Sequence, residues 1–82
     1  MNETIIKTEK ENLILFRNII GLRIAETRAN IEYWYLVTKK SKKNSQDRVD
    51  ALNNRASNEK RLKKDLIFIK VVDDMLKEYE TN

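Results

Sequence analysis

The chain contains no proline and a single glycine, Gly21. Proline ends helices, and glycine supplies the unusual backbone angles of tight turns, so little in this sequence can interrupt a helix or close the turns of a β-sheet. Charged residues make up 37% and hydrophobic residues 40%, proportions that are typical of long helices and too apolar for a disordered chain. The sequence therefore predicts an all-α fold.

The length of the chain limits how stable it can be alone. A domain of 82 residues buries only about 60–65% of the surface that its unfolded chain exposes, which leaves a small core. We therefore expect a single domain over residues 1–82 that is stabilised by self-association or by a partner.

The polar segments divide the chain into two helical arms. The first arm is expected over about 8–38, with Thr8 and Glu11 as a capping box, although a start near Asn2 fits as well. A basic turn over 39–45 follows, and Asn44 or Ser45 can cap a second arm over about 46–80. We predict two long antiparallel helices, a helical hairpin.

The second arm carries two apolar stripes that are out of phase. Val49, Leu52 and Ala56 form the first stripe. The second stripe consists of Leu62, Leu66, Ile69, Val72, Leu76 and Tyr79. At about 100° per residue the stripes differ by more than a third of a turn. A continuous, irregular helix is the favoured interpretation; a break near Ser57 would instead give a three-helix bundle.

The first arm is apolar on two opposite sides. One side consists of Ile6, Leu13, Phe16, Ile20, Ile24, Ile31 and Trp34, which we expect to face the second arm. The other consists of Leu15, Ile19, Leu22, Ala29, Tyr33 and Leu36. A hairpin covers only one of them, so the second side predicts an interface with another copy or a different protein. The alternative is a single broad apolar face inside a compact bundle.

Three aromatic residues close the first arm, at Tyr33, Trp34 and Tyr35. Consecutive helical residues point in different directions, so at least one ring is expected to be exposed, and Trp and Tyr are enriched in binding hot spots. The candidate protein-interface residues are therefore Leu15, Ile19, Leu22, Tyr33, Trp34 and Leu36.

Basic residues are concentrated around the turn, and the pI is about 9.4. The candidate anion contacts are Lys39, Lys40, Lys42 and Lys43, which could meet nucleic-acid phosphates or lipid headgroups. The alternative is a solvated turn, because the 13 acidic residues offset much of the charge.

The sequence offers no catalytic, cofactor-binding or metal-binding residues that fit a known chemistry. Without cysteine or histidine, it lacks the usual zinc ligands and the base of a hydrolytic triad. No apolar stretch reaches the roughly 20 residues of a membrane span, and the N-terminal segment does not fit a signal peptide. We expect a cytoplasmic protein that is not an enzyme.

The segments Asn18–Arg23 and Tyr33–Tyr35, together with the size and the Lys-, Asn- and Ile-rich style of the chain, resemble the lysis inhibition accessory proteins of T-even bacteriophages. The resemblance implies an antiholin-type regulator in the host cytoplasm that binds the cytosolic part of the phage holin. It assigns no role to any single residue. The other function that the sequence favours is a small basic protein that binds nucleic acid.

Overall fold

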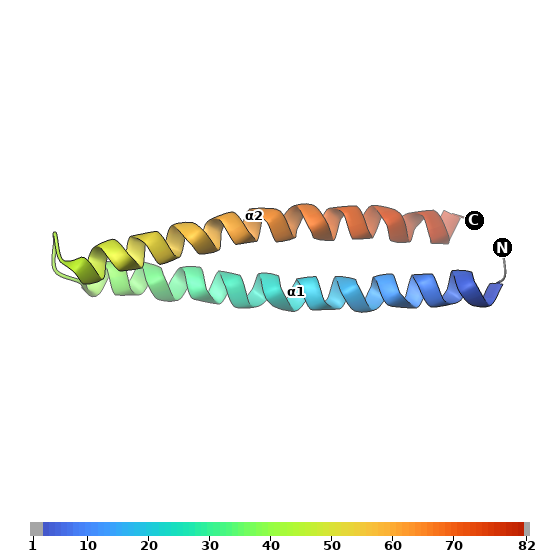
Figure 1. Cartoon of the computed structure of the whole chain (residues 1–82), viewed down its shortest axis with the longest axis horizontal. Helices are drawn as coiled ribbons and strands as arrows, with labels where there is room; N and C mark the ends of the chain where they lie inside the picture. The colour runs from blue at the N-terminus through green and yellow to red at the C-terminus, as the bar shows by residue number, and fades with distance from the viewer. Residues whose placement is uncertain (1–2, 82) are drawn as a thin grey trace.

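A computed structural model describes residues 3–81, except the side chains of residues 5, 6 and 81. Two helices, α1 (Glu3–Lys40) and α2 (Gln46–Thr81), lie side by side and antiparallel in a rod of 61 × 14 × 14 Å (Figure 1). No strand occurs in this part of the chain. The predicted all-α hairpin is confirmed, and α2 continues through Ser57 without a break. The predicted inward position of Ile6 lies outside the described side chains.

α1 begins earlier than the capping box predicts. Its first residue is Glu3, and the Thr8 hydroxyl donates a hydrogen bond of 2.8 Å to the carbonyl oxygen of Thr4, one turn back. A threonine inside a helix commonly bonds in this way. Thr8 is therefore an interior residue of the helix, because nothing in the segment before it disfavours helix.

Ser41 and Ser45 bound the turn between the helices. Both the backbone N–H and the hydroxyl of Ser41 donate to the carbonyl oxygen of Val37, at 3.0 and 2.7 Å. Asn44 has a φ of 66°, a left-handed conformation that asparagine tolerates better than most residues. The hydroxyl of Ser45 accepts a hydrogen bond of 3.2 Å from the N–H of Arg48 and so caps α2.

The two helices meet along a seam in which inner residues recur at alternating spacings of three and four, as in a coiled coil. On α1 the buried or half-buried seam residues are Leu13, Ile20, Ile24, Thr27, Ile31, Trp34 and Thr38. On α2 they are Arg48, Ala51, Arg55, Asn58, Leu62, Asp65, Ile69, Val72, Leu76 and Tyr79. The same spacing runs through all of α2, which explains why the helix needs no bend.

The apolar core lies in the half of the hairpin away from the turn, which we call the open half (residues 3–24 and 62–81). Ile20, Ile24 and Val72 are buried there. The residues packed around them are Leu13, Leu62, Ile69 and Leu76. In the remaining turn half, the residues that α2 contributes to the seam are small or polar, with Ala51 fully buried. The hydrophobic stabilisation of the fold is therefore concentrated in the open half.

Several residues of the apolar stripes described above do not face the partner helix. Val49 and Leu52 are each 46% exposed, and Ala56 is also exposed, because the phase fixed by the core brings Ala51, Arg55 and Asn58 to the seam instead. Phe16 and Leu66 lie beside the seam and are exposed as well.

Gly21 is the one glycine of the chain, and it lies inside α1 with helical geometry. A Cβ at this position would meet no atom within 4 Å. We expect Gly21→Ala to raise the free energy of unfolding by about 0.5–1 kcal/mol, because alanine loses less backbone entropy in a helix. Urea unfolding followed by circular dichroism measures the change. A loss of stability would mean that another chain closely approaches Gly21.

Candidate protein-binding surface

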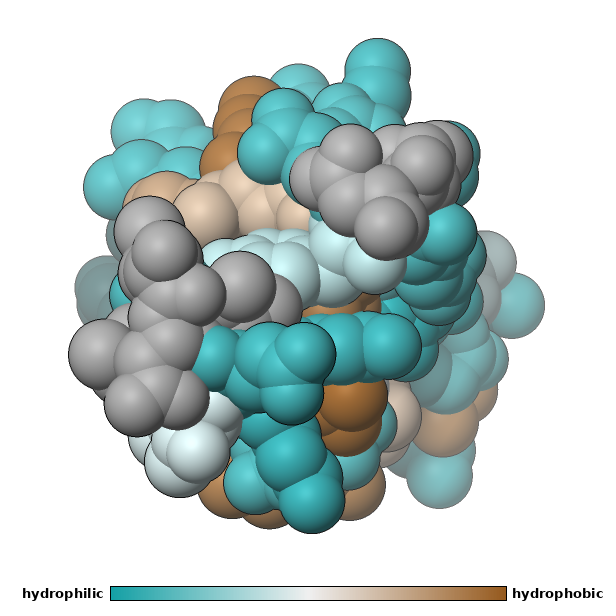
Figure 2. Space-filling model, turned by 90° about the vertical axis from the view of Figure 1, so that its right-hand side faces the viewer, coloured by the Kyte–Doolittle hydropathy of each residue, from teal (hydrophilic) through white to brown (hydrophobic). Residues whose placement is uncertain are grey.

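The apolar side of α1 that faces away from α2 is exposed, and we call it the outer face; Glu26 lies on the same side between Leu22 and Ala29 and divides it into two parts. Its residues are Leu15, Ile19, Leu22, Ala29, Tyr33 and Leu36. Leu22 is 72% and Leu15 is 60% exposed, so neither contributes much to the hairpin itself. Figure 2, which views the rod from its open end, shows hydrophobic residues at the surface among hydrophilic ones.

Trp34 lies apart from the other candidate interface residues. It is half-buried at the seam, whereas the neighbouring Tyr33 is 57% exposed. The two rings meet edge to face, with centroids 4.9 Å apart and an angle of 73° between their planes. Trp34 can therefore hold the Tyr33 ring in place on the outer face, while a partner would contact Tyr33 directly.

Two cationic side chains, one from each helix, lie over the aromatic ring of Tyr35. The Nζ atom of Lys39 and the guanidinium carbon of Arg55 each lie 5.1 Å from the centroid of its ring. Cations at this distance from an aromatic ring are attracted to it. Tyr35 thus joins the basic turn half of α1 to α2.

α2 contributes exposed apolar residues that the sequence interpretation missed. Ile67, Phe68, Val71 and Met75 are all between 43% and 65% exposed. The run Leu66–Ile69 contains the signal, because four consecutive apolar residues on a helix cover every side of it and cannot all face one partner. The open half of the hairpin is therefore apolar on its surface as well as in its core.

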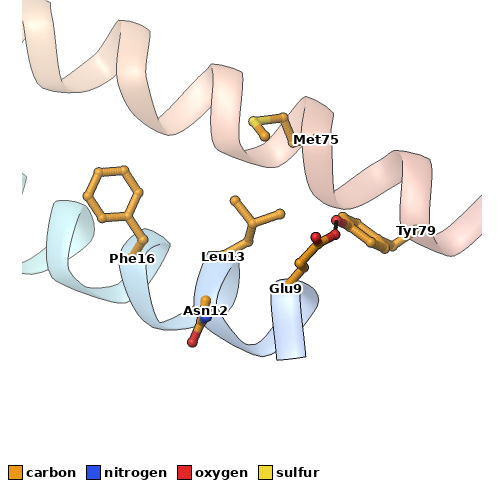
Figure 3. A pocket seen from close by; sticks show the side chains of 6 residues that line it. All are labelled: Glu9, Asn12, Leu13, Phe16, Met75 and Tyr79. Atoms are coloured by element: carbon orange, nitrogen blue, oxygen red, sulfur yellow. Dashed lines mark hydrogen bonds between the residues drawn. The ribbon is translucent and has the colours of Figure 1, made fainter. Parts of the chain in front are cut away.

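A shallow groove crosses the seam at the open end (Figure 3). Its walls are formed by Glu9, Asn12, Leu13, Phe16, Met75 and Tyr79. The Tyr79 hydroxyl donates a hydrogen bond of 2.8 Å to the Glu9 carboxylate, and this bond raises the pKa of Tyr79. Since the pKa of Tyr79 is raised in the folded state, the contribution of this bond to stability is present at neutral pH and is lost in alkali as the hydroxyl ionises.

Two ion pairs between the helices fix their register in the open half. Arg17 donates to Asp73, and the hydrogen bond to this carboxylate raises the pKa of Arg17. The second pair joins Arg23 to Asp65 at 3.2 Å; the Asp65 side chain is 1% exposed, whereas that of Arg23 is 44% exposed. A shift of one helix along the other would separate the buried carboxylate from its cationic partner. The ion pair therefore opposes such a shift.

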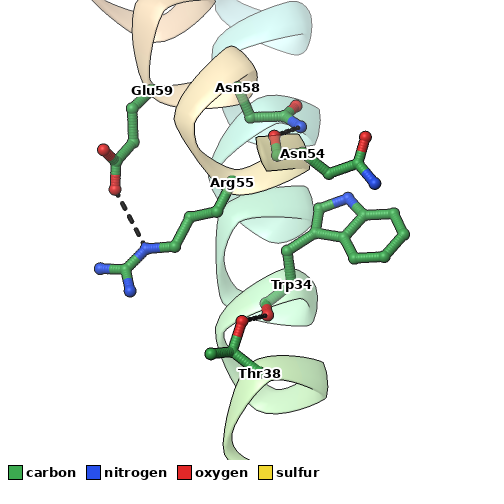
Figure 4. A network of polar contacts seen from close by, with 6 residues as sticks. All are labelled: Trp34, Thr38, Asn54, Arg55, Asn58 and Glu59. Atoms are coloured by element: carbon green, nitrogen blue, oxygen red, sulfur yellow. Dashed lines mark hydrogen bonds and ion pairs between the residues drawn. The ribbon is translucent and has the colours of Figure 1, made fainter. Parts of the chain in front are cut away.

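The candidate anion contacts Lys39, Lys40, Lys42 and Lys43 are all exposed around the turn. Figure 4 shows the nearby polar contacts, in which Thr38 donates to the carbonyl oxygen of Trp34 and Arg55 pairs with Glu59 at 3.1 Å. These bonds join residues of the same helix, so they build no enclosed site. The lysines are accessible, and their contact with an anion stays a prediction.

Within 3–81 no three acidic side chains gather in a way that could hold a metal ion. Neither α1 nor α2, as far as they are described, has an apolar stretch long enough to cross a bilayer. The surface that stands out is thus the exposed apolar one.

Comparison of the chain with models of known families, with curated proteins and with solved structures gave no match.

Proposed function

We propose that this hairpin is a non-enzymatic regulator that binds a protein partner through the outer face of α1. The observation that carries the proposal is the exposure of Leu22, Leu15 and Tyr33, which are between 57% and 72% accessible although the core of the hairpin is small. Large apolar residues gathered at the surface on one side of a helix are a usual signature of a protein contact. Aromatic residues such as Tyr33 often supply much of its binding energy.

The partner that we propose is an amphipathic segment in the cytosolic part of a phage holin. A straight rod with an apolar stripe along one helix can pair with the apolar side of another helix, which is a common mode of peptide recognition. The resemblance to phage lysis inhibition accessory proteins points to the same partner. In this proposal the hairpin acts in the host cytoplasm and delays lysis by occupying that segment.

Replacement of Leu22 by glutamate tests the proposal. We expect Leu22→Glu to weaken binding of a fluorescently labelled peptide from the cytosolic part of a T-even phage holin by about tenfold or more, because it introduces an unpaired charge into a desolvated contact. Folding should be unaffected, since the side chain is already 72% exposed. Fluorescence anisotropy measures binding, and circular dichroism measures the fold.

The matched control is Asn53→Glu, which adds the same charge at an exposed position of α2 in the turn half. It should bind the peptide like the wild type. A Leu22→Glu protein that is folded and binds normally would refute the role of the outer face. A wild-type protein that does not bind the peptide would refute the holin as partner.

A further inference from the structure

The net positive charge of the chain lies in the turn half (residues 25–61). This half holds nine basic and five acidic side chains, whereas the open half holds eight of each. The excess equals the formal net charge of the whole chain, +4. Five of the nine basic residues fall within 39–48, where Asp47 is the one acidic residue. The turn forms the end of the 61 Å rod that is opposite to both termini (Figure 1), so the positive charge is concentrated at one end.

The lysines of the turn are not neutralised by neighbouring carboxylates. They are exposed at Lys39, Lys40, Lys42 and Lys43. The ion pairs of the described residues all involve other cations. The nearest carboxylates along α2 are those of Asp47 and Asp50, and Asp50 accepts a hydrogen bond of 2.9 Å from Gln46. The turn therefore presents unpaired positive charge to the solvent, and this charge attracts anionic surfaces.

Three large side chains with apolar surface lie beside these lysines on one side of the seam, and we call them the turn face. They are Tyr35, Val49 and Leu52, each between 36% and 46% exposed. By coiled-coil geometry Tyr35 and Leu52 flank the seam on the same side, and Val49 lies one step further out. The Nζ atom of Lys39 lies over the Tyr35 ring. Positive charge and apolar area therefore adjoin on this side.

The acidic residues of the turn half lie outside the turn face. They are Glu26, Glu32, Asp47, Asp50 and Glu59. Coiled-coil geometry places Asp47 and Asp50 on the opposite side of the seam, and Glu26 lies at the boundary with the open half. Glu32 and Glu59 are on the side of the turn face but further from the turn, and Glu59 is paired with an arginine at 3.1 Å. Glu32 is roughly 10 Å along α1 from Lys39, so it borders the face without interrupting it.

From this arrangement we propose that the lysines of the turn and the turn face bind the surface of a bilayer that contains anionic phospholipids. The lysines lie among the lipid phosphates, and the side chains of Val49 and Leu52 reach the boundary between headgroups and acyl chains. Tyr35 is of a residue type that is enriched at this depth. The open half projects away from the bilayer with Leu15 and Leu22 accessible, so the inference does not rest on the proposed function.

A nucleic acid is the other anionic partner that a basic turn can meet, and two observations favour lipid over it. The cations of the turn are all lysines, which lack the planar guanidinium that binds a phosphate or a guanine through two parallel hydrogen bonds. Val49 and Leu52 would gain nothing from a phosphate backbone, which offers no apolar surface. A bilayer offers phosphates and apolar surface side by side.

Sedimentation of the full chain with lipid vesicles tests the inference. At about 100 mM salt, the partition coefficient onto vesicles with about 30% phosphatidylglycerol in phosphatidylcholine should exceed that onto pure phosphatidylcholine by about a hundredfold or more, because each lysine near an anionic surface contributes roughly fivefold. Replacing the four lysines of the turn by glutamine should remove this preference. Circular dichroism should show an unchanged helix content, since the four side chains are exposed.

The matched control replaces four exposed lysines of α2 in the open half by glutamine. They are Lys63, Lys64, Lys70 and Lys77. The control lowers the net charge of the chain by the same amount. Its binding to the phosphatidylglycerol vesicles should stay within about fivefold of the wild type, because these lysines lie more than a Debye length of about 10 Å from the turn. The pair of variants separates the position of the charge from its total.

The turn face is tested by replacing its two aliphatic residues. Val49→Gln/Leu52→Gln should weaken binding to the phosphatidylglycerol vesicles about tenfold, because it removes apolar surface that the bilayer covers. Helix content should be unchanged, since both side chains are 46% exposed in the hairpin. Ile67→Gln/Val71→Gln is the control; it changes two exposed apolar residues of the open half and should bind these vesicles like the wild type.

Equal binding of the wild type to the two kinds of vesicle would overturn the inference. So would equal binding by the two four-lysine variants, or normal binding by a folded Val49→Gln/Leu52→Gln protein. If the lysines of the turn are needed to bind a labelled DNA duplex but not the vesicles, the turn is a nucleic-acid contact instead. Vesicle binding that survives Leu22→Glu while peptide binding fails would support the turn and the outer face as separate surfaces.

Discussion

Arg23→Ala is expected to lower the free energy of unfolding by about 2–4 kcal/mol, because it leaves the Asp65 carboxylate buried without a charged partner. Asp65 is 1% exposed and is held by Arg23 at 3.2 Å through one oxygen. Its other oxygen, Oδ2, is buried and accepts no hydrogen bond from the described residues. The loss falls short of that for a fully buried pair because the Arg23 side chain is 44% exposed.

The matched variant removes the charge as well. Arg23→Ala/Asp65→Leu should recover most of the lost stability, since an apolar residue at this seam position faces the core and leaves no charge to solvate. Urea unfolding of the four proteins of the cycle measures the coupling. If Arg23→Ala alone is as stable as the wild type, the ion pair does not hold the buried carboxylate in place.

Ile20→Ala is expected to cost about 2–4 kcal/mol, because it removes a side chain from the centre of the small core and leaves a cavity. Ile20 is 2% exposed and packs with Ile24 and Val72. For a hairpin of this size such a loss is a large part of the total stability, so thermal melting should show a clear drop.

Leu15→Ala is the matched control on the outer face. Leu15 is 60% exposed, so the same truncation should change the free energy of unfolding by less than about 0.5 kcal/mol. Equal losses from Ile20→Ala and Leu15→Ala would mean that the two sides of α1 are both buried in the folded protein. The comparison should be made at a concentration where self-association does not contribute.

The pattern of apolar residues predicts the hairpin and its exposed outer face well. The absence of proline and the polar segment around the turn require two helices, and the spacing of Leu15, Ile19 and Leu22 separates them from the core residues Ile20 and Ile24. Helical periodicity is strong in the open half because apolar residues occupy the seam there.

In the turn half, the pattern of apolar residues does not predict which residues of α2 face α1. A helix keeps its phase, so the core at Leu62, Ile69 and Val72 determines which residues face α1 further back along α2. These are Ala51, Arg55 and Asn58, which are small or polar and leave no apolar signal, whereas the more hydrophobic Val49 and Leu52 point outward. Continuing the spacing of three and four from the core residues of α2 toward the turn identifies the residues that face α1 there.

Phe16 and Asp65 show what periodicity cannot supply. Phe16 is on the apolar side of α1 but falls beside the seam, because the register between the helices decides which of two neighbouring positions is covered. Asp65 occupies a seam position, and its burial depends on a partner, Arg23, that is far away in sequence. Both follow from the pairing of the helices, and neither from one helix alone.

The salt dependence of binding to the holin peptide tests the central claim most directly, which is that the hairpin works through apolar contacts. Between about 50 and 500 mM salt the Kd should change by less than about threefold, because burial of apolar surface is not screened by ions. Replacing Lys39, Lys40, Lys42 and Lys43 by glutamine should leave that Kd unchanged. An affinity that falls by about a thousandfold over this range, or that disappears with the four lysines, would contradict the account and indicate that the basic turn binds anions such as nucleic-acid phosphates.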